Sequence, residues 1–338
     1  MYVDVALDSI ITYAITVGAS DIHFDPILNS IQVRLRIDGL LTEYMLVDAT
    51  DADMLVNRIK VFSGMDISEK RLPQDGRWEW SVKSYAVTMR VSSLPSLYGE
   101  AIVCRLMGNE GVHKNLLELG MDVELQEKIA ALLKRPYGLI TICGPTGSGK
   151  TATLYAMLRM LNLKETKLIC LEDPVEATIE GAIQIGINEK IGFTFSKGLR
   201  TVLRQDPDSI MIGEIRDNET AQLAVKTALT GHRVITTVHT NTALGVIGRL
   251  VDMGVEPYLL HATLIGSLSQ RLVRRIDSTT HSYQGRLGLF EYLEIPFSDI
   301  DWDHVEQYMF TSLQDSAHLA INSGITTLEE VHRAGILL

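Results

Sequence analysis

Residues 144–151 of this chain read Gly-Pro-Thr-Gly-Ser-Gly-Lys-Thr, which is a complete phosphate-binding loop. The apolar run at residues 138–143 predicts a strand that leads into the loop, and apolar residues recur at helical spacing from Leu154 to Leu161. Strand, glycine-rich loop and helix in this order are the context that separates a nucleotide site from a chance match. The octapeptide therefore predicts an α/β domain with a nucleotide at the edge of its sheet.

The loop residues have separate roles in holding a nucleotide. The glycines let backbone N–H groups turn toward the phosphates, and the following helix adds its dipole. Lys150 can reach the β- and γ-phosphates, and the hydroxyl of Thr151 can bind Mg²⁺. The sequence thus predicts ATP and Mg²⁺ as cofactors. The predicted nucleotide-binding residues of this segment are Gly144, Pro145, Thr146, Gly147, Ser148, Gly149, Lys150, Thr151 and Ala152.

Composition limits the class of protein. With 338 residues, 46% of them hydrophobic and 22% charged, the chain has the composition of an ordinary globular protein and the length of two domains. The net charge of −11 argues against broad nucleic-acid binding, so we expect no direct contact with nucleic acid. No signal-peptide pattern and no membrane-spanning apolar stretch is found, so a cytoplasmic location is expected. Cys104, Cys143 and Cys170 lie in apolar stretches and are expected to be buried, reduced thiols.

The first third of the chain predicts a separate, smaller domain. Residues 1–107 carry an α+β pattern in which apolar and polar residues alternate over residues 31–37 and again over 78–91. Asp38-Gly39 supplies a hairpin turn after the first of these strands. Residues 108–120 carry three glycines and are predicted to be an interdomain linker.

Residues 121–338 alternate between helical and strand patterns, which predicts a parallel sheet with flanking helices. Three of the strands end in polar residues, namely Glu172-Asp173, Glu214 and His239, and strand ends of this kind line a ligand crevice. Glu214 is the best candidate to orient or activate the attacking water, and Glu172 is a second catalytic candidate. The alternative for Glu214 is an ordinary solvated carboxylate after a strand.

The expected magnesium ligands are few. Gly213 occupies the position where many ATPases carry a Mg²⁺-binding aspartate. Without that carboxylate, Thr151, the phosphates and waters remain as ligands, with Asp173 or Glu172 contributing through a water. Thr151 and, through water, Asp173 are therefore the predicted metal residues.

Histidines and arginines supply the remaining candidates. His239 is expected to sense the γ-phosphate and His232 to lie at the nucleotide, although a histidine near a strand end is more often a structural hydrogen bonder. Phosphoryl transfer also needs positive charge, which Arg204 and its neighbours Arg200 and Arg216 can supply. Each arginine has the alternative of an ordinary surface charge.

Longer motifs extend over nearly the whole chain. In the first domain they are residues 19–24, 34–39, 73–77 and 89–91, and in the second residues 171–176, 199–208 with 212–217, and 230–241. The last three resemble the Asp box, Walker B region and His box of one family. That family is the secretion ATPases that power type II secretion, type IV pilus assembly and competence pili.

The resemblance implies a RecA-like P-loop motor domain preceded by a PAS-like α+β domain, assembled as a homohexamer at the inner face of the cell membrane. It implies an inner-membrane platform protein as partner and, indirectly, pilin-like subunits that ATP turnover assembles. It also implies that Arg77 and Arg90 reach nucleotide across a domain or subunit boundary. Arg90 has opposite parity to Met89 and Val91, so we expect it to face away from their apolar side.

Two departures from the family pattern bear on the branch. Long members carry an additional N-terminal domain, whereas this chain is expected to begin directly at the second one. Many members carry a tetracysteine zinc element after a Ser-x-Gln-Arg-Leu motif, but here residues 268–272 are followed by no cysteine, so no zinc is expected. Both features resemble the competence branch of Gram-positive bacteria, which imports DNA. Residues 73–77 and 98–100 resemble the assembly branch rather than the retraction branch.

The leading prediction is therefore a motor ATPase for assembly of a type IV or competence pseudopilus. A pilus-retraction motor would use the same chemistry with the opposite mechanical output. A nucleotide-gated scaffold with little turnover stays open because of Gly213. A DNA-translocating motor is disfavoured by the acidic balance.

Overall fold

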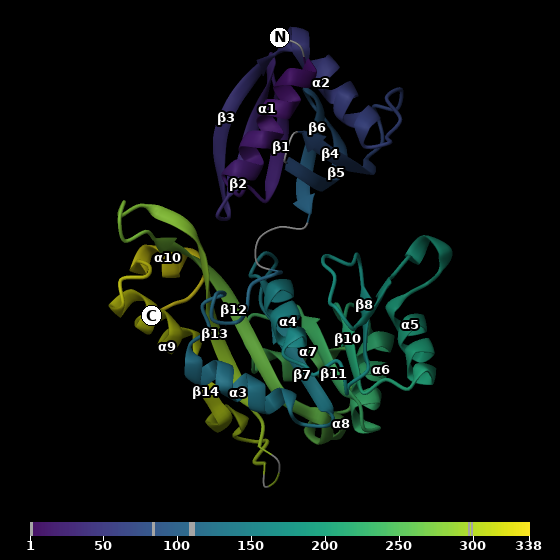
Figure 1. The fold of residues 1–338 in the computed structure, drawn as a ribbon, viewed down its shortest axis with the longest axis vertical. Helices are drawn as coiled ribbons and strands as arrows, with labels where there is room; N and C mark the ends of the chain where they lie inside the picture. Colours follow the sequence, from purple (N-terminus) through teal and green to yellow (C-terminus); the bar gives the residue numbers. More distant parts are fainter. Residues whose placement is uncertain (1–2, 83–84, 108–111, 297, 299) are drawn as a thin grey trace. The chain divides into compact units, whose positions relative to one another are not determined.

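The computed structural model describes residues 3–82, 85–107, 112–296, 298 and 300–338. The chain divides into two compact units, Met1–Glu110 and Gly111–Leu338, and each is described by itself (Figure 1). The segment expected to be a linker lies partly outside the described residues. Of its described part, Leu116 is buried in the core of the second unit.

The first unit is an antiparallel sheet covered by two helices. The sheet has the strand order β3-β2-β1-β6-β5-β4, and α1 and α2 supply apolar side chains to its core. Its elements are α1 (Val3–Thr16), β1 (Asp21–Ile27), β2 (Ser30–Ile37), β3 (Leu40–Asp48), α2 (Ala49–Phe62), β4 (Gln74–Val82), β5 (Tyr85–Ser96) and β6 (Gly99–Met107). The turn between β2 and β3 is made by Asp38 and Gly39, both at positive φ, which confirms the first predicted hairpin.

Alternation along the strands gives this sheet an apolar face and a polar face. Met89 and Val91 are fully buried, whereas Arg90 between them is exposed, so the predicted orientation of Arg90 is confirmed. Arg77 of β4 is the direct cross-strand partner of Arg90. The two arginines therefore lie side by side on the polar face. The sequence also predicts a second hairpin turn at Lys83-Ser84, and this position lies outside the described residues.

The second unit is built on an eight-stranded sheet in its described residues, with the order β14-β13-β12-β7-β11-β10-β8-β9. The strands are β7 (Gly138–Cys143), β8 (Leu168–Glu172), β9 (Ile183–Gly186), β10 (Ser209–Ile212), β11 (Arg233–Val238), β12 (Leu264–Ile276), β13 (Tyr283–Glu294) and β14 (Met309–Thr311). Neighbours from β9 to β12 are parallel, as predicted. The antiparallel extension by β13 and β14 departs from the predicted parallel sheet.

Helices cover both faces of this sheet, which is the α/β layering of a RecA-like domain (Figure 1). Side chains of α3 and α4 pack in one core cluster and those of α5 to α8 in another. Two further helices, α9 and α10, pack against β12 and β13. The helices are α3 (Val123–Leu133), α4 (Lys150–Arg159), α5 (Phe195–Val202), α6 (Asn218–Leu229), α7 (Gly245–Asp252), α8 (Pro257–Thr263), α9 (Leu313–Asn322) and α10 (Leu328–Arg333), with short 3₁₀ turns η1 (Glu189–Ile191), η2 (Leu203–Gln205) and η3 (Val305–Tyr308).

The cysteines and the lengths of the helices bear on two of the sequence predictions. All three cysteines are free and buried, as predicted. Within the described part of the chain, no helix combines the length and apolar character that a membrane crossing requires.

Candidate nucleotide site

The phosphate-binding loop connects β7 to α4. All six residues of β7 are buried, which anchors the start of the loop, and α4 begins at Lys150. Gly144, Gly147 and Gly149 have φ of 143°, 77° and 86°, a region that favours glycine. A Cβ atom at Gly144 would also lie 2.6 Å from the backbone oxygen of Gln270. The glycine spacing of the loop is therefore required both by its backbone turns and by the neighbouring strand.

Two polar groups in the loop are suited to receive anionic oxygens. The Lys150 ammonium donates to the backbone oxygens of Gly144 at 2.8 Å and Pro145 at 2.9 Å, and burial lowers the pKa of Lys150. No carboxylate of the described residues lies within ion-pair distance of it. The Ser148 hydroxyl is buried without a hydrogen-bond partner among the same residues. Groups of this kind fit the phosphates of a nucleotide.

Glu214, His239, Arg216 and Asp173 form one polar cluster at the carboxyl ends of β10, β11 and β8. The Arg216 Nη2 donates to Glu214 Oε1 at 2.5 Å, and Arg216 Nη1 lies 3.5 Å from Asp173 Oδ2. His239 Nε2 lies 3.1 Å from Glu214 Oε2. Burial alone would raise the pKa of Glu214, but Arg216 and His239 outweigh it, and the pKa is lowered. The cluster thus holds an ionised carboxylate beside an imidazole.

Glu172 takes part in a different network. Glu172 is 4% exposed, and its carboxylate accepts one hydrogen bond from the Tyr155 hydroxyl and another from Gln184 Nε2 at 3.0 Å. The Tyr155 oxygen also accepts from the backbone N–H groups of Glu176 and Ala177. Burial raises the pKa of Glu172. Its oxygens therefore join α4 to the segment after β8, and the structure does not bring them to the Glu214 cluster.

His232 and Arg204 do not lie with the loop of their own chain. His232 immediately precedes β11, at the opposite end from His239, and its Nδ1 is 3.1 Å from the backbone oxygen of Thr227. Arg204 lies in η2 before the start of β10 and donates to the Arg200 oxygen at 2.9 Å. The phosphate loop follows the carboxyl end of a parallel strand. His232 and Arg204 come before the amino ends of β11 and β10, so they lie at the opposite ends of the strands from the loop. The prediction that His232 and Arg204 bind nucleotide is therefore not supported by contacts within one chain, and it stays a prediction.

The backbone contacts of Gly213 explain why that position carries no side chain. Its N–H donates to the Leu171 oxygen at 2.8 Å, and its own oxygen accepts from Thr237 Oγ1 at 2.6 Å. A Cβ atom there would lie 3.2 Å from the Leu171 oxygen, which is tighter than ordinary contact. Close approach of β8 and β10 therefore disfavours the aspartate found at this position in many ATPases.

Several residues of the site were not recognised from the sequence. Tyr155 is one of the buried residues of α4, and Gln184 lies in a short edge strand. Neither position has a sequence pattern that indicates a functional residue. Arg216 was recognised only as one of three arginines. Its position two residues after Glu214 is the one clue, because a short polar turn after a strand brings such side chains together.

A glycine loop between a buried strand and a helix, with a carboxylate and an imidazole at adjacent strand ends, defines a P-loop nucleotide-binding protein of RecA-like fold. The model of the type II/IV secretion system protein family matches residues 2–333, and the chain belongs to that family.

Comparison with individual proteins agrees with this assignment. The chain is 49% identical over 270 residues to a type II secretion system protein E of Klebsiella pneumoniae, covering 80% of this chain and 54% of that protein. It is 39% identical over 372 aligned positions to the type II secretion system ATPase E of Vibrio cholerae, covering 97% and 74%. The crystal structure of the pilus retraction motor PilT with bound ADP is similar with a TM-score of 0.68 and 28% identity, covering 96% of each chain. The chain thus spans about half the length of the Klebsiella relative.

Proposed function

We propose that this chain is an ATP-hydrolysing motor of a type II secretion or pilus-assembly machine. The observation that carries the proposal is the Glu214–His239 pair, which lies at the same edge of the sheet as the phosphate loop. β7, β11 and β10 are adjacent and parallel, so Lys150, His239 and Glu214 follow three neighbouring strand ends. This arrangement supplies a phosphate cradle and a base to one small region.

In the proposed reaction each residue has a definite task. Lys150 leaves its two carbonyl partners and binds the phosphates of ATP, whose negative charge replaces those weaker contacts. Glu214 orients the attacking water, and the pKa lowered by Arg216 and His239 keeps it ionised at neutral pH. The Arg216 contact must loosen before Glu214 can take a proton. His239 then lies where it can respond to the transferred phosphoryl group.

The residues present fit Mg²⁺ bound together with a nucleotide. Thr151 supplies one hydroxyl at the start of α4, and Asp173 supplies an exposed carboxylate held by Arg216. No group of three His, Cys, Asp or Glu side chains suited to a metal occurs in the described ranges. A single hydroxyl with phosphate and water ligands is a normal environment for Mg²⁺. When bound, the ion would neutralise charge on the phosphates.

The assembled form of the motor is a further part of the proposal. We infer a homohexamer on an inner-membrane platform protein at the cytoplasmic face, with pilin-like subunits as the indirect cargo. Arg77 and Arg90, exposed and adjacent on the first unit, would complete the nucleotide site of the ring. Arg204 lies away from its own chain's loop, which favours a contact in a neighbouring subunit for it as well. Membership of the secretion family supports these inferences.

The branch within the family is proposed from the relatives. Those of Klebsiella and Vibrio, both Gram-negative, are named as type II secretion proteins, and this favours a type II secretion machine. The competence branch, predicted from the missing cysteines, has no such support and stays a prediction. The retraction alternative rests on the likeness to PilT alone.

The proposal is tested by steady-state phosphate release from ATP by the purified chain, with and without single-stranded DNA. We expect turnover that is abolished by Lys150→Ala and unchanged by DNA. Stimulation by DNA would favour a translocating motor. Nucleotide binding without turnover, in a preparation with confirmed hexamers, would favour the scaffold alternative.

A further inference from the structure

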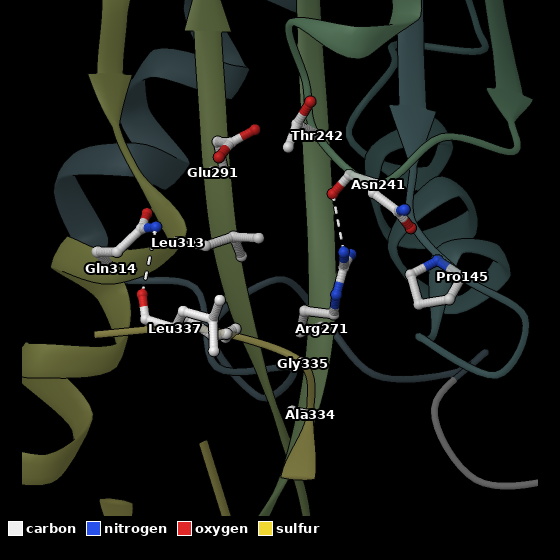
Figure 2. A pocket seen from close by; sticks show the side chains of 11 residues that line it. Pro145, Asn241, Thr242, Arg271, Glu291, Leu313, Gln314, Ala334, Gly335 and Leu337 are labelled. Carbon is white, nitrogen blue, oxygen red and sulfur yellow. Dashed lines mark hydrogen bonds between the residues drawn. The ribbon is translucent and has the colours of Figure 1, made fainter. Parts of the chain in front are cut away.

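The loop that follows His239 is held by buried charged side chains from two other strands. Arg271 of β12 is 7% exposed, and its Nη2 donates to the Asn241 oxygen at 2.8 Å (Figure 2). Glu291 of β13 is 6% exposed, and its Oε1 accepts from the Ala243 N–H at 2.5 Å. A positive group therefore binds a carbonyl of the loop, and a negative group binds an N–H two residues later.

Two weaker contacts act on the same segment. Ser269 Oγ donates to the Asn241 oxygen at 3.2 Å, and Cys143 Sγ donates to the Thr242 oxygen at 3.2 Å. Cys143 is the last residue of β7, directly before the phosphate loop. The backbone of residues 241–243 is thus bound by side chains at each residue, although the side chains of Asn241 and Thr242 are exposed.

The two buried charges bind the loop rather than each other. Among the described residues, neither Arg271 nor Glu291 has an ion-pair partner within 4 Å. Burying a charge is costly, and here both the attraction between Arg271 and Glu291 and their hydrogen bonds to backbone groups compensate for it. Such bonds are stronger than neutral ones, and their loss would be felt directly by the loop.

Ala243 at the end of the loop is fully buried in the core of the second unit, whereas the other side of the loop borders open space. A cavity of about 470 Å³ lies beside it, lined among others by Pro145 of the phosphate loop, Thr242, Arg271, Glu291 and residues 334–337 (Figure 2). Apolar packing therefore fixes the loop at Ala243, whereas the side chains of Asn241 and Thr242 are exposed. The backbone between His239 and Ala243 is held by polar contacts, which come from β7, β12 and β13.

We propose that Arg271 and Glu291 are positioning residues that hold residues 241–243 and thereby place His239 against Glu214. Only Thr240 separates His239 from the held segment, so a shift of that segment moves the imidazole. The inference rests on the proposed ATPase function, because His239 has a task only in that reaction. Arg271 of β12 and Glu291 of β13 would thus affect catalysis indirectly, through the loop, without touching the nucleotide themselves.

Hydrogen exchange tests the first half of the proposal without any activity. Glu291→Gln removes the charge that accepts from Ala243, so exchange of a peptide covering residues 236–246 should become about 10-fold faster in the nucleotide-free protein. Glu294→Gln is the matched control, because Glu294 is on the same strand but pairs with Lys128 of α3 at 3.0 Å. If Glu291→Gln does not fold, Arg271→Lys tests the contact to the Asn241 oxygen in the same way. Exchange equal to that of the control in the folded variant would overturn the proposal.

Kinetics test the second half. Glu291→Gln should lower kcat about 10-fold while the dissociation constant of nucleotide changes less than about 3-fold. In a His239→Ala background the same substitution should have no further effect, because it acts through the imidazole. Additive losses in the double variant would overturn the positioning role. If the unsubstituted chain does not hydrolyse ATP, the proposed function fails. The exchange experiment still decides whether Glu291 and Arg271 hold residues 241–243.

Discussion

Glu330 of α10 provides a prediction whose size follows from the contacts around it. Its side chain is fully buried and accepts hydrogen bonds from the Arg274 Nη2 at 2.8 Å and the Arg333 Nη2 at 2.5 Å. The backbone N–H of Arg274, in β12, also donates to it at 2.8 Å. Burial alone would raise the pKa of Glu330, but these contacts outweigh it and lower the pKa to about 2. The carboxylate thus ties the last helices to β12.

Glu330→Gln keeps the shape of the side chain and removes its charge. The pKa shift corresponds to about 3 kcal/mol of native-state stabilisation, which we reduce to about 2 kcal/mol because Arg333 is partly exposed and screened by solvent. The melting temperature of the second unit should therefore fall by about 4–8 °C at pH 7. Calorimetry of the whole chain measures this, and Glu329→Gln, on the adjacent exposed residue, is the control.

The pH dependence follows from the direction of the shift. Because the folded-state pKa is depressed, the stabilisation is complete above the unfolded-state pKa of 4.5 and is lost as the pH falls toward about 2. The gap between the native chain and Glu330→Gln should accordingly shrink over that interval. A gap that stays constant with pH, or a Glu329→Gln variant equally destabilised, would refute the reasoning.

Two further predictions concern the metal content and the ring. The purified protein should hold no stoichiometric zinc, because the thiolates of a structural site are missing after Leu272 and His281 alone cannot replace them; one zinc per chain that survives dialysis against a chelator would contradict this. Mixed Lys150→Ala and Arg77→Ala subunits, each inactive alone, should regain part of the activity, since some interfaces pair an intact loop with an intact arginine worth roughly 10³–10⁵ in rate. If mass measurements show subunit exchange and the mixture stays inactive, Arg77 does not act across the boundary.

The fold around the phosphate loop could be predicted because its signals are local. The strand before the loop is fully apolar, and the strands before Glu172, Glu214 and His239 read as buried runs that end in polar residues. In a parallel sheet such ends share one edge, so the cluster of Glu214 and His239 was predictable from order alone.

β12, the strand on which the antiparallel extension by β13 and β14 is built, could not be predicted in the same way. β12 buries Ser267, Ser269, Gln270 and Arg271, so its sequence lacks the apolar run that marks a central strand. These polar groups are accommodated by partners that are distant in sequence, such as Thr153 for Gln270 and Asn241 for Arg271. Long-range pairing of this kind leaves no local pattern.

Side-chain direction limited the prediction of the site itself. Like Glu214, Glu172 stands at the end of an apolar strand in the sequence. Its carboxylate, however, accepts hydrogen bonds from Tyr155 and Gln184. Which way the carboxylate at a strand end points depends on which neighbours donate hydrogen bonds to it. The donor here, Tyr155, lies on a helix at a position that the sequence pattern predicts to be part of the core. His232 precedes β11 whereas His239 follows it, so the two histidines lie at opposite ends of the strand.

Lys150 is proposed to bind nucleotide and Glu214 to activate water. The most direct test of these two roles measures nucleotide affinity and ATP turnover together in one variant of each residue. Lys150→Ala should lose nucleotide binding, because the loop places no other positive group. Glu214→Gln should bind nucleotide within about 3-fold of the native chain and lose at least about 100-fold in turnover, because it changes the base and not the phosphate cradle. Equal loss of nucleotide affinity in both variants, or native turnover by Glu214→Gln, would contradict the account.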